Sequence, residues 1–318
     1  MKDLTRYKKE FKKVKKDIGK VIVGYEDIVD DFLICLMTEG HLLLEGVPGI
    51  AKTTLIKAFT AAVGLDYERI QFTQDLLPAD ISGHYYYNQR SGDFELRKGP
   101  IFAQILMADE INRAPPKTQS ALIEAMQEKQ VTIEGTTLSL PDPFLVIATR
   151  NPIETEGVYP LPEAQLDRFM IKSDMTYISS SKELKMLRMK NEDNLVNIKN
   201  NENGFGKKII GLHRKVHVSE PILKYIRDII IETREANELV LGASPRAGEQ
   251  LLYASKAQAL LNGRDYVIPD DIKSITHKVL NHKLILSVDA ELEGIEKWDV
   301  MKDILDNKVE APKGKTND

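Results

Sequence analysis

One loop between an apolar run and a helix-forming run constrains the fold of this chain more than any other segment. Residues 41–45 are mostly apolar, residues 46–53 read GVPGIAKT, and a helix-forming run follows to about residue 62. This order of a buried strand, a glycine-containing loop and a helix is typical of a phosphate-binding loop. Glycines allow backbone N–H groups to surround phosphate oxygens, and the N-terminus of the helix adds a positive dipole. The sequence therefore predicts a nucleotide-binding α/β domain.

Two residues of this loop have expected chemical roles. Lys52 is expected to reach the β- and γ-phosphates, and the hydroxyl of Thr53 to hold Mg²⁺. Ala51 departs from the strict pattern G-x-x-x-x-G-K-[ST], which has glycine there, and such loops also occur without ligands. We therefore sought support elsewhere in the chain. The expected phosphate-binding residues are Gly46, Pro48, Gly49, Ile50, Ala51, Lys52, Thr53 and Thr54.

Two later apolar runs end in polar residues of the kind that nucleotide hydrolysis requires. The run at 105–108 is followed by Asp109, which can hold the Mg²⁺ shell, and Glu110, which can polarise an attacking water. A third apolar run, 145–149, leads to Asn151. Open α/β sheets bind their ligands at the carboxyl ends of parallel strands. The three runs together predict a nucleotide-hydrolysing site rather than three unrelated turns.

The alternation of elements predicts two domains. Strands are expected at 41–45, 68–73, 102–108, 144–150 and 169–173, with helices at 53–62 and 117–129, which is typical of a parallel sheet covered on both faces. Two insertions, 74–100 and 130–143, read as hairpins.

After residue 175 we expect helices alone: one over 219–237 capped by Ser219, one from 245 to Gly263, and one opened by Pro269. Residues 191–206 are expected to form an exposed loop, and residues 308–318 a frayed tail. The predicted domains are 1–178 and 179–318.

Composition excludes several classes of protein. The 318 residues are 42% hydrophobic, enough for two cores, and a net charge of −4 gives no general attraction to nucleic acid or to acidic membranes. The single cysteine, Cys35, rules out a disulfide framework within the chain and fits a reducing cytoplasm. No apolar run approaches a membrane span, and the start lacks the apolar segment of a signal peptide.

The first twenty residues carry eight lysines and one arginine against three acids. Their apolar residues recur at three- and four-residue spacing, from Leu4 to Ile18, so an amphipathic helix is expected. Packing on its own or a neighbouring subunit is favoured over a role as a membrane or nucleic-acid arm, which stays open.

Six segments together resemble the MoxR family of AAA+ ATPases. They are residues 46–53, 72–80 (FTQDLLPAD), 109–119 (DEINRAPPKTQ), 148–152 (ATRNP), 161–169 (LPEAQLDRF) and 244–246 (SPR). The resemblance spans nearly the whole chain, and alanine before the lysine is common in that family. It implies an AAA+ module with sheet order 5-1-4-3-2 and a C-terminal helical lid. It also implies a homo-oligomeric ring, expected to be a hexamer, with ATP bound between subunits.

The resemblance also implies roles for single residues. Asn151 corresponds to the sensor that orients the water, Arg246 to the lid sensor, and Arg168 to an arginine finger that reaches a neighbour's site. Val23 and Gly24 correspond to residues near the adenine. The insertions 74–100 and 130–143 correspond to the helix-2 insert and the hairpin before the sensor strand. The expected catalytic residues are thus Glu110, Asn151, Arg168 and Arg246, with Thr53 and Asp109 as metal ligands and ATP and Mg²⁺ as cofactors.

The expected function is ATP hydrolysis that remodels or matures partner proteins, often ones bearing von Willebrand A domains. Two alternatives remain: a nucleic-acid motor related to minichromosome-maintenance helicases, which the acidic net charge disfavours, and a nucleotide-gated scaffold. The role of Arg113, next to the acidic pair, is also open between a contact across the subunit boundary and a structural salt bridge.

Overall fold

The computed structural model describes residues 2–312 except 155, 192–197, 199, 200, 202 and 203. The chain forms two compact units, one of residues 12–169 and 173–210, the other of residues 1–11, 170–172 and 211–318. The expected loop at 191–206 lies largely outside the described residues, as does the end of the expected tail. The predicted domain boundary at residue 178 stays a prediction.

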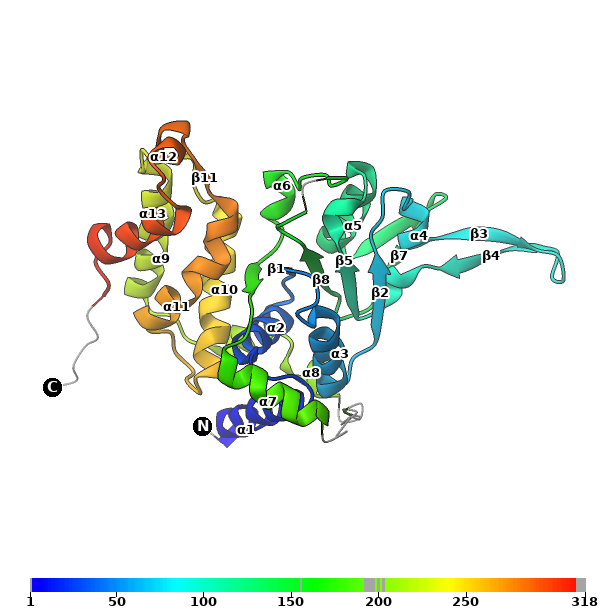
Figure 1. The fold of residues 1–318 in the computed structure, drawn as a ribbon, viewed down its shortest axis with the longest axis horizontal. Coiled ribbons are helices and arrows are strands. Elements are labelled where there is room, and N and C mark those ends of the chain that lie inside the picture. Colours follow the sequence, from blue (N-terminus) through cyan, green and yellow to red (C-terminus); the bar gives the residue numbers. More distant parts are fainter. Residues whose placement is uncertain (1, 155, 192–197, 199–200, 202–203, 313–318) are drawn as a thin grey trace. The chain divides into compact units, whose positions relative to one another are not determined.

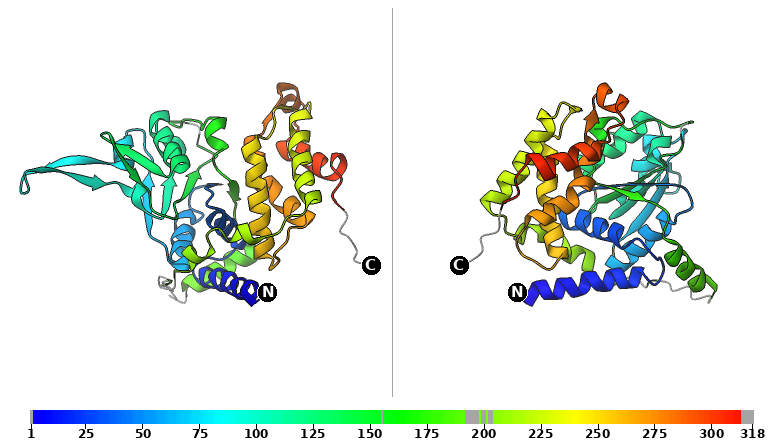
Figure 2. Two further views of the ribbon diagram at one scale, coloured as in Figure 1. Left: turned by 180° about the vertical axis from the view of Figure 1, so that it is seen from behind. Right: turned by 60° about the vertical axis from the view of Figure 1, so that its left-hand side comes forward.

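The larger unit is built on a five-stranded sheet (Figures 1 and 2). Its strands are β1 (Leu42–Gly46), β2 (Tyr67–Gln71), β5 (Ile105–Asp109), β8 (Leu145–Arg150) and β9 (Ile171–Met175). The order in space is β2-β5-β8-β1-β9, and the pairs β2·β5, β5·β8 and β8·β1 run parallel. Numbered among themselves, these strands have the order 5-1-4-3-2, so the predicted sheet is confirmed.

Both faces of the sheet are covered, because the central strands alternate between two apolar environments. Leu43, Leu106 and Val146 belong to a core with Leu122 and Met126 of the helix α5 (Pro116–Glu128). The intervening residues of the same strands are also buried, as expected for parallel strands between helical layers. The helices before residue 210 are α1 (Lys2–Ile18), of which residues 2–11 belong to the smaller unit, α2 (Glu26–Thr38), α3 (Lys52–Val63), α4 (Pro78–Ser82), α5 (Pro116–Glu128), α6 (Glu163–Leu166), α7 (Ser180–Asn191) and α8 (Phe205–Ile209).

Both predicted hairpins are present. Strands β3 (Gly83–Asn88) and β4 (Asp93–Lys98) form a ribbon that extends away from the sheet of their own unit (Figure 1). Strands β6 (Gln130–Ile133) and β7 (Thr136–Ser139) form the second hairpin, which turns at Glu134 and Gly135. The expected strand at 102–108 begins later than predicted, because a 3₁₀ turn, Pro100–Phe102, precedes β5.

The smaller unit is mainly helical but does contain strands, so the expectation of helices alone after residue 175 was wrong. A short antiparallel pair joins β10 (Leu239–Leu241) to β11 (Ile285–Leu286). Ser219, the expected cap, precedes its helix but its side chain makes no capping bond. A capping bond that was not predicted joins Ala247 N to the Ser244 hydroxyl, which accepts it. The helices are α9 (Glu220–Glu235), α10 (Pro245–Leu261), α11 (Pro269–Leu280), α12 (Val288–Leu292) and α13 (Lys297–Asp303).

The N-terminal helix α1 buries the part of its predicted apolar stripe that runs from Phe11 to Ile18, and Leu4 lies outside the residues whose side chains are described. Phe11, Val14 and Ile18 are each almost fully buried. The lysines between them remain at the surface, except that Lys15 forms an ion pair with Asp30 of α2. The helix is therefore part of a packed core.

Candidate functional site

The predicted phosphate-binding loop connects β1 to α3, and its backbone follows the conformations that such a loop requires. Gly49 has φ +83°, and Ala51, directly before the helix, has φ +68°. Ala51 thus lies in the left-handed region that glycine enters at little cost and that strains other residues. A Cβ atom on Gly46 would lie 2.6 Å from the carbonyl oxygen of Met175, so only glycine fits there without rearrangement.

The Lys52 side chain folds back over the loop. Its Nζ donates a hydrogen bond to the carbonyl oxygen of Gly46 at 2.6 Å. Burial lowers the pKa of Lys52, while the negative charges of Asp109, Glu110 and Glu154 act in the opposite direction. The loop cation and three carboxylates therefore share one electrostatic environment, which is the main feature of the site.

Asp109 ends β5 and is held from two sides. Its Oδ1 accepts a hydrogen bond from Thr149 Oγ1 at 2.5 Å, and its Oδ2 accepts from Arg69 Nε and Nη2 at 3.0 and 2.7 Å. Arg69 lies on the neighbouring strand β2, in register with Met107. The carboxylate is buried, with 11% of its side chain exposed, so its orientation is fixed by protein groups.

Glu110 follows in the left-handed conformation, with φ +56°. Its backbone N–H donates to Thr149 Oγ1 at 2.9 Å, and its carboxylate accepts from Gln71 Nε2 at 2.6 Å. Arg113 Nε lies 3.0 Å from Glu110 Oε2. Strain of this kind at a non-glycine residue is typical of functional sites.

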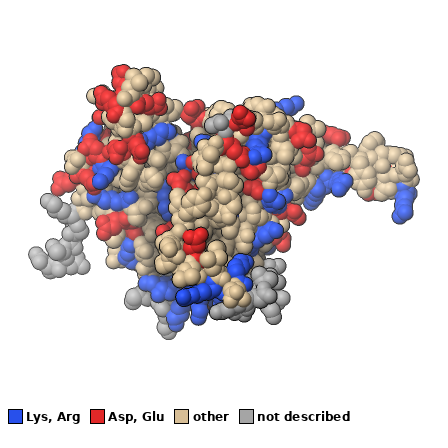
Figure 3. Space-filling view, viewed as in Figure 1, with Lys and Arg blue, Asp and Glu red and all other residues tan. Residues whose placement is uncertain are grey.

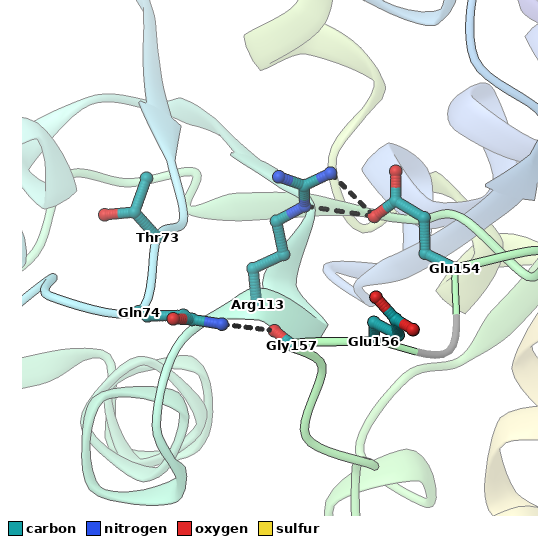
Figure 4. Close-up of a pocket in the computed structure, with 6 residues that line it drawn as sticks. All are labelled: Thr73, Gln74, Arg113, Glu154, Glu156 and Gly157. Carbon is teal, nitrogen blue, oxygen red and sulfur yellow. Dashed lines mark hydrogen bonds and ion pairs between the residues drawn. The ribbon is translucent and has the colours of Figure 1, made fainter.

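Asn151 lies just beyond the end of β8 and is buried. Its Oδ1 accepts a hydrogen bond from Ile153 N at 3.2 Å, and its side chain also hydrogen-bonds Glu154. Glu154 borders a cavity of about 400 Å³ whose lining includes Thr73, Gln74 and Arg113 (Figure 4). The sequence-predicted groups Lys52, Asp109, Glu110 and Asn151 are therefore brought together around one polar region.

The two other predicted arginines are placed differently. Arg168 is partly buried, and its Nη1 is enclosed without a hydrogen-bond partner among the described residues. A reach toward another subunit therefore requires this side chain to turn outward. Arg246 belongs to the other compact unit, where it is exposed in the first turn of α10. Its predicted role rests on the sequence.

Comparisons with known proteins agree with this geometry. Residues 41–171 match the family profile described as "ATPase family associated with various cellular activities (AAA)", and residues 231–304 match the AAA lid domain. A protein named Chaperone MoxR1 from Mycobacterium tuberculosis is 42% identical over 91% of this chain and 79% of its own length. The chain belongs to the MoxR family of AAA+ ATPases.

Two further relatives of this MoxR-family chain resemble it over almost their whole length. The uncharacterized protein YeaC of Bacillus subtilis is 45% identical over 92% of each chain. A solved structure of a candidate ATPase from Cytophaga hutchinsonii has a TM-score of 0.89, at 44% identity and 98% coverage of both chains. The AAA+ fold with its lid is thus shown for this chain. None of its described helices is long and apolar enough to cross a membrane.

A second cavity lies beside the phosphate loop of this MoxR-family chain and is lined by part of it. It has a volume of about 390 Å³, and Val23, Pro48 and Gly49 line it together with Tyr25 and Tyr177. Gly24, the other residue expected near the adenine, packs against Ile178, which also lines the cavity. An apolar cavity beside a phosphate loop suits a flat heterocyclic base.

Sequence reasoning missed the groups that hold the acidic pair. Arg69, Gln71 and Glu154 contact Asp109, Glu110 or Arg113, yet none stands in a recognisable motif. A signal for Gln71 was available, because the predicted sheet order places the end of β2 beside that of β5. In the observed register Gln71 lies opposite Asp109. Glu154 offered no such signal, because it lies in an irregular segment after β8.

Proposed function

We propose that this MoxR-family chain binds ATP and hydrolyses it to ADP and phosphate. The observation that carries the proposal is the convergence of the loop cation Lys52 with Asp109 and Glu110 at the carboxyl edge of the sheet. On this reading the loop backbone and Lys52 hold the phosphates, and Glu110 accepts a proton from the attacking water. Asn151 orients that water, and the cavity beside Val23 holds the adenine.

The residues near the loop suit Mg²⁺, which prefers oxygen ligands and retains several of its waters. Thr53 and Asp109 are the residues that would hold the ion. Both Asp109 oxygens already accept hydrogen bonds from protein groups, so contact through a coordinated water fits this aspartate well. The bound ion would neutralise charge that develops on the phosphates.

We further propose that the chain assembles into a ring, a hexamer in our proposal, and uses turnover to remodel or mature partner proteins in the cytoplasm. Arg168 would then contact ATP held by the next subunit, and Arg246 would act from the lid. The relative named Chaperone MoxR1 supports a chaperone-like role. Proteins with von Willebrand A domains are the partner class we propose first.

Two variants test the chemistry separately. Lys52→Ala removes the phosphate-binding cation, so it should weaken binding of a fluorescent ATP analogue. Glu110→Gln keeps the shape and the loop, so it should retain affinity and lose turnover. Equal loss of affinity in both variants would contradict the roles assigned to these residues.

The Glu110→Gln protein also serves to identify partners. A ring that binds ATP and cannot cleave it should hold its clients, so an affinity pull-down with ATP should enrich them relative to the Lys52→Ala protein. The same turnover assay separates the alternatives. Stimulation by DNA would favour the nucleic-acid motor, and absence of any turnover in the wild-type chain would favour the scaffold.

A further inference from the structure

Glu154 is a third carboxylate at the site, and the roles above leave it unused. Arg113 Nε and Nη2 lie 3.0 and 2.8 Å from Glu154 Oε2, as the dashed lines in Figure 4 show. The same Nε lies 3.0 Å from Glu110 Oε2. One guanidinium therefore joins Glu154 to the carboxylate proposed to accept the proton. Within this chain Arg113 therefore bridges two acids.

Glu154 also contacts the second group proposed to touch the water. The hydrogen bond from Arg113 lowers the pKa of the Glu154 carboxyl, and a hydrogen bond from the Asn151 side chain lowers it further. Glu154 is therefore ionised at neutral pH and holds Arg113 on one side and Asn151 on the other. Because Lys52 also lowers this pKa, the carboxylate lies within the field of the phosphate loop.

We propose that Glu154 is a positioning residue, which sets Glu110 through Arg113 and sets Asn151 directly. The proposal rests on the proposed ATPase function. Both positioned groups act on one water molecule, so their relative placement matters more than the position of either alone. A planar guanidinium suits the task, because its fixed fork of donors can contact two carboxylates at once.

The exposure of the pair argues against a role in stability. The side chains of Arg113 and Glu154 are 41% and 28% exposed, and ion pairs at such positions contribute little to the free energy of folding. The contacts instead connect the ends of β5 and β8, which carry Glu110 and Asn151. Loss of the bridge should therefore change turnover far more than it changes folding.

The first test is Glu154→Gln, measured with purified chain, ATP and Mg²⁺. We expect kcat to fall about 10²-fold, the size of effect that a catalytic group misplaced by ~1 Å can have, while KM and the affinity for a fluorescent ATP analogue change little. Glu156→Gln is the matched control. Glu156 lines the same cavity and makes no ion pair among the described residues. Equal loss of kcat in both variants, or a change in KM alone, would overturn the proposal.

A double-mutant cycle tests the connection itself. If Arg113 and Glu154 act as one bridge, kcat of the Arg113→Ala/Glu154→Ala protein should equal that of the slower single variant. Independent, multiplicative losses would overturn the bridge. Glu154→Asp retains the charge at shorter reach, and it should recover only part of kcat if position matters.

These outcomes separate the inference from the function on which it rests. No turnover in the wild-type chain under any condition would end both. Normal turnover in the wild-type chain together with normal kcat in Glu154→Gln and Glu154→Asp would end the positioning role and leave the ATPase assignment intact. Nucleotide affinity of each variant shows that it is folded.

Discussion

Arg69 donates two hydrogen bonds to one oxygen of Asp109, from Nε at 3.0 Å and from Nη2 at 2.7 Å. The pair connects the edge strand β2 to β5. It places the permanent positive charge of Arg69 directly beside the carboxylate that is proposed to hold Mg²⁺. Cation binding at Asp109 therefore takes place against the repulsion of Arg69, or requires that Arg69 move.

We predict that Arg69→Ala lowers the Mg²⁺ concentration needed for half-maximal ATP turnover. Two unit charges ~4 Å apart repel by about 1 kcal/mol at a water-like dielectric, so removing one positive charge at that distance from a divalent ion relieves about 2 kcal/mol, which corresponds to about a thirtyfold shift. The measurement is an ATPase titration with Mg²⁺ at fixed ATP. Arg69→Lys, which keeps the charge, is the control and should stay near the wild-type value. A higher Mg²⁺ requirement in Arg69→Ala would show that Arg69 instead helps to orient Asp109.

A second prediction concerns His41, which is buried at the start of β1. Its Nδ1 accepts a hydrogen bond from Val146 N at 3.0 Å, and its Nε2 lies 3.1 Å from the carbonyl oxygen of Met126. Nε2 therefore carries the proton and donates it to that oxygen, so the ring is neutral. Burial lowers the pKa of His41 from 6.5 to about 4.

In the unfolded chain His41 is protonated below about pH 6.5, whereas in the native chain its lowered pKa keeps the ring neutral down to about pH 4. The contribution of neutral His41 to the free energy of unfolding is thus complete above pH 6.5. It is lost as pH falls from about 6.5 to about 4, and the loss reaches up to about 3 kcal/mol. Urea unfolding at about pH 7 and about pH 5 measures it. His41→Asn should be less stable at the higher pH and lose less on acidification than the wild type. Parallel losses in both proteins would assign the acid sensitivity to other groups.

The sequence allowed both hairpins and the principal acidic groups to be predicted, because each depends on local patterns. Apolar runs located β1, β5 and β8, whereas the order of the strands in the sheet came from the resemblance to the MoxR family. Strands β10 and β11 span three and two residues, which is too short for an alternation to be visible. Their pairing depends on contacts between segments far apart in the chain.

Contacts at the site were harder to predict for a related reason. β2 is the edge strand, and most of its residues are exposed. Its Arg69 therefore reads as an ordinary solvated charge. Only the register with β5 shows that this arginine faces Asp109. Glu154 lies 41 residues from Arg113, and no periodicity connects them.

The β3–β4 hairpin leads to a third prediction, because its two faces differ. Tyr87 and Phe94 lie opposite each other with ring centroids 5.5 Å apart and are 56% and 71% exposed. On the other face Tyr86 and Asn88 hydrogen-bond Glu95. The outer part of the hairpin is mostly uncharged on the side shown in Figure 3. The exposed aromatic face of this ribbon suits an apolar segment of a client.

We expect a shortened 88–92 turn to leave basal ATP hydrolysis within a few-fold of normal and to disrupt partner-dependent activity. Tyr87→Ser should have the same effect, whereas Tyr86→Ser, on the polar face, should have little. Basal and partner-stimulated turnover of the three proteins provide the comparison. Collapse of basal turnover in a variant that still binds nucleotide would contradict this separation of roles.

The last prediction is that two subunits share each site, with Arg168 acting on the γ-phosphate held by a neighbour's Lys52. Arg168 Nη1 is enclosed and lacks an acceptor among the residues that the structure describes. An unpaired buried donor is costly, so an acceptor supplied in the assembly would relieve that cost. An arginine finger contributes about 10³–10⁵ in turnover. Arg168→Ala should therefore nearly abolish hydrolysis and leave ATP affinity largely intact.

Mixing the variants decides whether the finger acts between subunits. Arg168→Ala and Lys52→Ala proteins are each expected to be inactive alone. When they are co-assembled, some boundaries pair an intact phosphate loop with an intact finger, so partial ATPase activity should return. Native mass spectrometry shows whether mixed assemblies form. Mixed assemblies without recovered activity would assign Arg168 a role within its own chain, where its backbone N–H donates to the carbonyl oxygen of Gln165 in α6 at 3.2 Å and its side chain is partly buried.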